Sequence, residues 1–132
     1  DGGPRLTAVT WTPASAGVEV ALGMTWRVEA PIRRDWTVFV HVLAPGADAP
    51  VAQADGMPFG PIFPMRLWPT GAVLDSVHPL GGAALPPGAA LAIGLYDAAT
   101  GERARPSGTV AGGRVDADAR RVVVPLAAMT AP

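Results

Sequence analysis

The sequence contains no lysine, no asparagine and no cysteine, and it has a single glutamine, Gln53. Without cysteine the chain can form neither a disulfide framework nor a thiolate metal site. All ten basic residues are therefore arginines, scattered from Arg5 to Arg121, and eleven acidic residues bring the formal net charge to −1. Because no basic stripe results, nucleic acid is not expected as a partner.

Long apolar runs are missing as well. No stretch approaches the roughly 18–20 apolar residues of a membrane-spanning helix, so no membrane span is expected in this chain. The first residues carry neither the basic nor the apolar region of a signal peptide, and a chain that begins at Asp1 suggests a processed or excised piece.

Glycine and proline, in contrast, are abundant, with 16 and 15 residues among 132. A helix interior tolerates them poorly, since proline there costs about 3 kcal/mol and glycine about 1 kcal/mol relative to alanine. Short strands accept them at their ends and in the turns between them. The apolar content of 49% argues against disorder. The composition thus predicts one all-β domain over residues 1–132 and excludes a helical bundle, a coiled coil and a collagen-like repeat.

Hydrophobic alternation locates the strands. In the clearest one, over 17–30, the residues expected on the core face are Val18, Val20, Leu22, Met24, Trp26 and Val28. The segment 34–44 also fits a helical period, but its run of β-branched residues favours a strand, and its two apolar faces predict a central one.

Further strands are expected over 5–12, 51–54, 71–80, 88–97, 102–105 and 120–126. The last should be an edge strand, because Pro125 cannot donate to a neighbour. The segment 108–118 is weakly patterned, and residues about 106–119 are expected to be mobile. Seven to eight short strands at this spacing predict a single antiparallel β-sandwich, immunoglobulin-like or jelly-roll-like.

The most unusual segment is 55–70, which contains four prolines among aromatic and aliphatic residues. A loop of this length in a compact domain is typically functional or packed on itself. The candidate interaction or ligand-binding residues are Met57, Phe59, Ile62, Phe63, Met65, Arg66 and Trp68. Arg66 is expected to anchor the loop by pairing with Asp55.

Catalytic and metal-binding residues are not expected. Ser76 and His78 share a strand face, but a hydrolase needs a nucleophile, a base and an orienting acid together. Two isolated histidines are also poor grounds for a zinc site. We expect His41 to be a core-edge imidazole, His78 to be a solvated turn residue, and Trp26 and Trp36 to be core residues. Neither cofactor nor metal is predicted.

Three stretches resemble a known domain: WRVEAPIRRDWTVFVHVLAPG, AQADGMPFGPIFPMRLWPTGAVLDS and LPPGAALAIGLYDAATGER. Their ordered succession resembles the C-terminal extracytoplasmic β-sandwich of bacterial membrane glycosyltransferases of the dolichyl-phosphate-mannose mannosyltransferase type, as in Chloroflexota-like genomes. The matching positions are 26, 35–43, 52–55, 67–75 and 85–103. The chain departs from the pattern at Ala72 and Ala90 and lacks the multispanning catalytic region. The resemblance implies a sandwich fold and a periplasmic or cell-surface location, but not glycosyl transfer.

Two hypotheses for the function follow from the sequence. The leading hypothesis is a non-catalytic extracytoplasmic sandwich that serves as an interaction, assembly or accessory subunit of a membrane-associated complex. Its partner would be another protein or a further copy of itself, contacted through the 56–70 loop and an edge strand. The alternative is a carbohydrate-binding module that presents the loop aromatics to a glycan.

Overall fold

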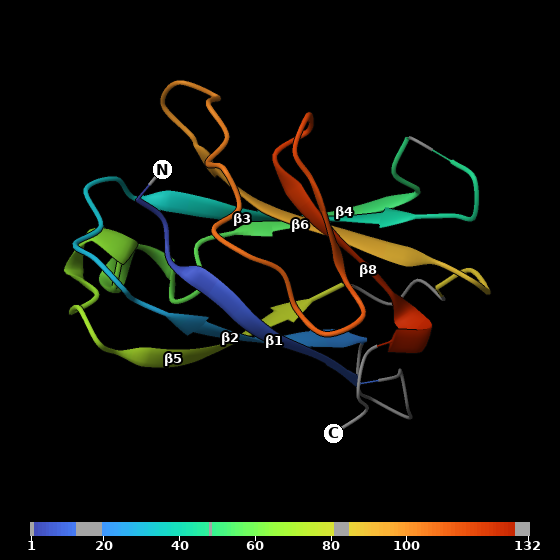
Figure 1. Ribbon diagram of the computed structural model, residues 1–132, viewed down its shortest axis with the longest axis horizontal. Coiled ribbons are helices and arrows are strands. Elements are labelled where there is room, and N and C mark those ends of the chain that lie inside the picture. Colours follow the sequence, from blue (N-terminus) through green and yellow to red (C-terminus); the bar gives the residue numbers. More distant parts are fainter. Residues whose placement is uncertain (1, 13–19, 48, 81–84, 129–132) are drawn as a thin grey trace.

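The computed structural model describes residues 2–12, 20–47, 49–80 and 85–128. In these ranges eight strands form two antiparallel sheets, which confirms the predicted all-β sandwich (Figure 1). The three-stranded sheet has the order β1-β2-β5 and the five-stranded sheet has the order β4-β3-β6-β8-β7. The strands are β1 (Arg5–Thr12), β2 (Ala21–Arg27), β3 (Trp36–Leu43), β4 (Ala52–Gly56), β5 (Val73–Pro79), β6 (Ala90–Asp97), β7 (Arg114–Asp116) and β8 (Arg121–Pro125). No helix in the described ranges is long and apolar enough to cross a membrane.

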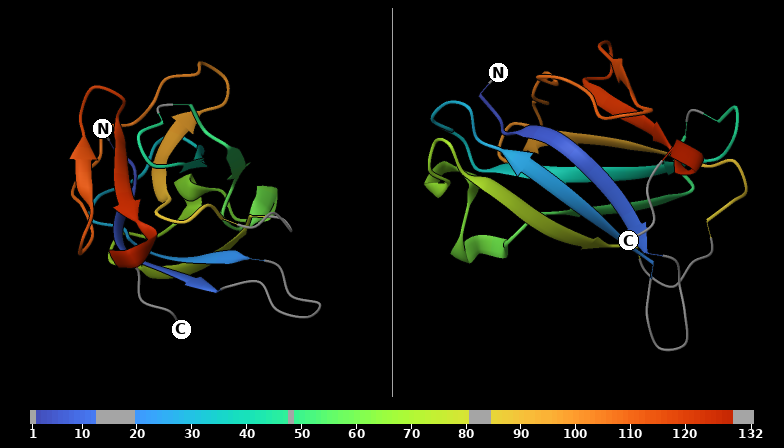
Figure 2. Two further views of the ribbon diagram at one scale, coloured as in Figure 1. Left: turned by 90° about the vertical axis from the view of Figure 1, so that its right-hand side faces the viewer. Right: turned by 60° about the horizontal axis from the view of Figure 1, so that its bottom comes forward.

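The two sheets enclose one main core (Figure 2). Along β2 and its flanking residues, the predicted alternation is confirmed from Val20 to Val28, where every second residue is buried. Val18, also expected on this face, lies outside the described residues. Facing them, Val38, Val40 and Val42 of β3 are fully buried. Trp26 and Trp36 are both core residues, as expected from their neighbours.

β3 is central, as its two apolar faces predict, since it lies between β4 and β6. Its second face, which points away from the main core, buries Phe39 and Leu43. Leu43 joins Ala92 and Val123 in a small separate cluster on this side. We call this side the outer face of the five-stranded sheet.

The C-terminal part of the sheet differs from the prediction. β8 is not an edge strand, because it lies between β6 and β7. Pro125 is tolerated because β7 pairs with β8 only as far as Val123, so the proline ring faces no neighbour on that side. The segment predicted to be weakly patterned contains β7, and of the expected 102–105 strand only a single bridge between Tyr96 and Arg103 forms.

Candidate functional site

The segment 57–70, which we call the aromatic loop, connects β4 to β5 and forms two one-turn 3₁₀ helices, η1 (Gly60–Ile62) and η2 (Met65–Leu67). Three rings pack on one another at its centre: Phe59, Phe63 and Trp68, with centroids 5.6–6.2 Å apart. The Trp68 indole N–H donates to the carbonyl of Phe63 at 3.1 Å. These contacts make the loop a self-packed unit joined to the main core.

The seven predicted loop residues have very different exposures. Met65 and Trp68 are buried at 1% and 3% exposure, whereas Ile62 is 89% exposed. Met57, Phe59 and Phe63 are half-buried and Arg66 is exposed. Leu67, which was not among the predicted residues, is 57% exposed. The final residue of each short helix is thus an aliphatic side chain that faces solvent.

Arg66 does anchor the loop, but the predicted partner was wrong. Its Nε lies 3.2 Å from Oδ2 of Asp35, and its backbone N–H donates to Oδ1 of the same carboxylate at 3.4 Å. Asp55 instead lies on the outer face of β4, opposite Phe39, and is exposed. Both side chains of the Arg66–Asp35 pair are largely solvent-accessible, so its role is positional more than energetic.

A groove runs between the aromatic loop and the segments that face it. Met57, Pro61 and Pro64 form its apolar wall. The opposite wall comes from 33–37 and 97–99, with Arg33 and Arg34 among its residues. Arg34 pairs with Glu102 at 2.7 Å, and both side chains are exposed.

The strand that follows the loop, β5, is an edge of the three-stranded sheet. At its two ends, the N–H of Leu80 donates to Val20 and the carbonyl of Ala72 accepts from Val28. Even-numbered residues therefore bond to β2, and alternation leaves the backbone groups of the odd-numbered residues at the free edge. Their side chains point outward, with Val73 64% and Val77 68% exposed.

Ser76 and His78 do meet, but they face the core. The Trp26 indole N–H donates to Ser76 Oγ at 2.9 Å, and Oγ lies 2.7 Å from His78 Nε2. Ser76 Oγ carries one proton and two acceptor lone pairs, so it bonds Nε2 as donor or as acceptor according to the imidazole tautomer. The prediction of a solvated His78 was wrong, since β5 extends to Pro79 and its even-numbered residues point inward. Ser76 is only 3% exposed, and its hydroxyl joins two buried ring nitrogens, Trp26 Nε1 and His78 Nε2.

Burial lowers the pKa of His78 below its ordinary value of 6.5. The folded chain therefore binds fewer protons than the unfolded chain, and stability should fall as the pH drops through 6.5 toward the lower folded-state pKa. Denaturant titrations from roughly pH 7 to pH 5 should show a smaller loss for His78→Asn than for the parent. His41→Asn should also reduce the loss, because burial lowers the pKa of His41 too. An unchanged loss in His78→Asn would contradict this account.

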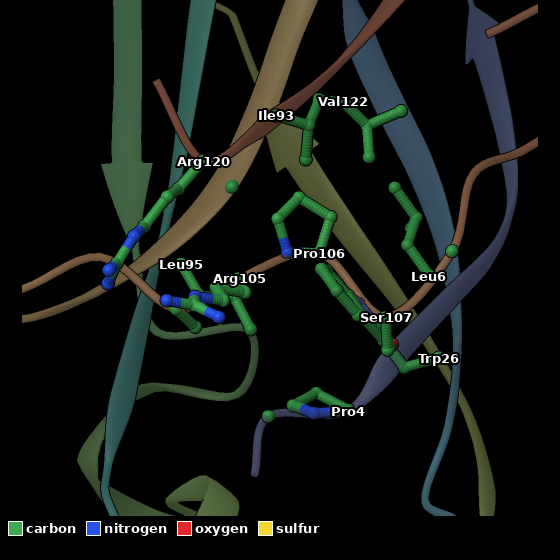
Figure 3. Close-up of a pocket in the computed structure, with 14 residues that line it drawn as sticks. Pro4, Leu6, Trp26, Ile93, Leu95, Arg105, Pro106, Ser107, Arg120 and Val122 are labelled. Atoms are coloured by element: carbon green, nitrogen blue, oxygen red, sulfur yellow. The ribbon is translucent and has the colours of Figure 1, made fainter. Parts of the chain in front are cut away.

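A narrow crevice opens between the sheets under residues 104–108 (Figure 3). Its walls are Leu6 and Trp26 from one sheet and Ile93 and Val122 from the other, with Pro106 across it. Its volume of about 40 Å³ suits a few water molecules better than a sugar ring.

Searches against models of known protein families, curated proteins and solved structures gave no match. Among the described residues, no group of three or more His, Asp or Glu side chains is placed to hold a metal ion. The candidate contact features are therefore the exposed residues of the aromatic loop, the β5 edge and the polar surfaces.

Proposed function

We propose that this chain is a non-catalytic β-sandwich that serves as an interaction or assembly domain, docking through the aromatic loop and the free edge of β5. The observation that carries the proposal is the exposure of Ile62 and Leu67, at 89% and 57%, on a loop whose other large apolar side chains are buried or half-buried. Exposed aliphatic residues on a rigid support are typical of a contact surface.

The rigidity of the loop favours binding. The ring cluster, the Trp68–Phe63 hydrogen bond and the Arg66–Asp35 contact fix its shape before any partner arrives. Binding then orders few additional groups, and the free-energy cost of association is lower.

The β5 edge offers a second kind of contact. Val73, Asp75 and Val77 leave their backbone donors and acceptors at the free side of the strand, where an extended segment of a partner can pair with them. Pro79, which has no N–H, limits such pairing at the C-terminal end of β5. Asp75 is the charged residue of this edge, and its carboxylate accepts a hydrogen bond from Thr25 at 2.7 Å.

The partner in this proposal is another protein or a further copy of the chain, and the location is extracytoplasmic. The resemblance to the extracytoplasmic sandwich of membrane glycosyltransferases supports that location and an accessory role beside a membrane-associated complex. The inward placement of Ser76 and His78 supports a non-catalytic role, since a nucleophile must reach its substrate.

The double variant Ile62→Ser/Leu67→Ser should abolish association, because it removes the aliphatic tips and leaves the buried loop residues in place. Sedimentation velocity over rising protein concentration measures self-association. A photo-crosslinking residue at position 67, tested in an extracytoplasmic fraction, detects a different partner. Val51→Ser is the matched control, since Val51 is also 57% exposed but lies outside the loop. A parent chain that stays monomeric and forms no discrete adduct from position 67 would refute the proposal.

A carbohydrate-binding role is the second candidate, supported by the half-buried rings of Phe59 and Phe63, which pack 5.9 Å apart on the same loop as Arg66. Trp68 offers little ring surface to a sugar, because it is 3% exposed. Phe59→Ala/Phe63→Ala should then lose binding on a glycan array while Ile62→Ser/Leu67→Ser keeps it. The opposite ranking would assign the loop to protein contacts.

A further inference from the structure

The outer face of the five-stranded sheet carries a cluster of polar and aromatic side chains that the docking proposal does not use. The pairing of β3 with β4 places Phe39 opposite Asp55 and His41 opposite Gln53. The rings of Phe39 and His41 lie 4.9 Å apart, and the Tyr96 ring lies 6.4 Å from Phe39. The aromatic residues are buried or half-buried, while Asp55 and Gln53 are exposed. The face therefore offers hydrogen-bonding groups on a packed aromatic base.

Two guanidinium groups on this face are held in place by hydrogen bonds. That of Arg103 lies over the Phe39 ring, 4.3 Å from its centroid, and donates to the carbonyl of Ala119 at 2.8 Å. Arg121 donates from Nε to Asp116 at 2.9 Å, and its side chain is only 15% exposed. The hydrogen bond from Arg121 is the main reason that the pKa of Asp116 is lowered. A guanidinium has more N–H donors than these bonds use, and holding each one in place reduces the cost of binding a ligand.

A strained turn helps to build this arrangement. Arg120 has φ 50°, and among the described residues it is the only one other than glycine with positive φ. From this turn its guanidinium donates to the carbonyl of Arg103 at 2.7 Å, while Arg103 donates to the neighbouring Ala119. A non-glycine residue keeps such a conformation only where its surroundings enforce it. Here the two hydrogen bonds between the turn and Arg103 hold Arg120 in this conformation.

His41 lies among these charges. It is half-buried, and within the described ranges its ring nitrogens have no hydrogen-bond partner. Burial lowers the pKa of His41, Arg103 and Arg121 lower it further, and Asp55 opposes them. A neutral imidazole beside two arginines is therefore left as an open N–H donor.

We propose that Arg103, Arg121 and His41 form a binding site for an oxyanion, a carboxylate or phosphate group, on the outer face of the five-stranded sheet. The two guanidinium groups would make charge-assisted hydrogen bonds to its oxygens, and the imidazole would donate a third. Asp55 borders the site, and its negative charge weakens the binding of anions. Replacing Asp55 with a neutral residue should therefore raise the affinity. The site is independent of the aromatic loop and β5.

Proton NMR of the full chain titrated with inorganic phosphate tests this site. The chain has only two histidines, so each ring contributes its own Cε1–H signal. At constant ionic strength the His41 signal should shift saturably and its pKa should rise, because a bound anion stabilises the imidazolium, while the His78 signal stays in place. An acetate titration, compared with phosphate, distinguishes the two oxyanions.

Arg121→Gln should weaken phosphate binding at least tenfold, and Arg103→Gln should do the same. Asp55→Asn should strengthen binding severalfold, a gain that misfolding cannot produce. If Arg103→Gln does not fold, Arg121→Gln and Asp55→Asn decide. Arg33→Gln is the matched control, since Arg33 is exposed and lies by the aromatic loop. A His41 signal unmoved by both anions, or equal weakening in Arg33→Gln and Arg121→Gln, would overturn the proposal.

Discussion

Replacing Trp68 with alanine should lower the free energy of unfolding by about 3–5 kcal/mol, as expected for removing a buried aromatic side chain. Trp68 is 3% exposed, packs against Phe59 and Phe63, and belongs to the main core. Its loss leaves a cavity under the loop and removes the donor to the Phe63 carbonyl. Urea denaturation, with the midpoint and slope compared to the parent, measures the change.

Two further variants separate the contributions to this loss. Trp68→Phe keeps a ring but removes the N–H, so it should cost about 1–2 kcal/mol. Leu67→Ala, at the neighbouring exposed position, should stay within about 0.5 kcal/mol of the parent. If Trp68→Ala cost as little as Leu67→Ala, the loop would not be part of the core, and its indole would be free to contact a ligand.

The alternating strands could be predicted because one buried face imposes a period of two on the sequence. Val20 to Val28 and the two faces of β3 follow this rule, and so do the strand residues Trp26 and Trp36. The predicted strand 71–80 covers β5, but His78 was expected in a solvated turn at its end because it precedes Pro79, whereas an edge strand with a free N–H side accommodates that proline. His78 is therefore part of the strand, and its side chain is buried.

The polar contacts could not be predicted, because pairing between distant strands creates them. Arg66 pairs with Asp35 and not with Asp55, which is closer in sequence. Residues 33–37 form the wall that faces the loop, whereas Asp55 lies on the outer face of the five-stranded sheet. Ser76 and His78 were placed on one face, but Trp26 joins them only through the pairing of β2 with β5. The outer-face arginines similarly carry no motif.

The second large effect is expected at Gly94, which lies beside Phe39 on the outer face. A Cβ built at Gly94 overlaps Cζ and Cε2 of the Phe39 ring and lies 3.0 Å from the carbonyl of Arg120. The ring cannot move aside easily, because it is 2% exposed and lies under the Arg103 guanidinium. Gly94→Ala should therefore destabilise the fold by about 3 kcal/mol, the upper end of typical overpacking.

Gly56→Ala is the control for Gly94→Ala, since a Cβ at Gly56 on β4 meets nothing within 4 Å and that residue has no positive φ. It should be neutral or slightly stabilising, because alanine restricts the unfolded chain. Phe39→Leu combined with Gly94→Ala should cost less than the sum of the single changes, because the shorter side chain frees the space. Additive losses, or a Gly94→Ala variant as stable as Gly56→Ala, would show that the Phe39 ring is mobile. The arginine positions on which the oxyanion proposal depends would then be mobile too, because Arg103 stacks on that ring.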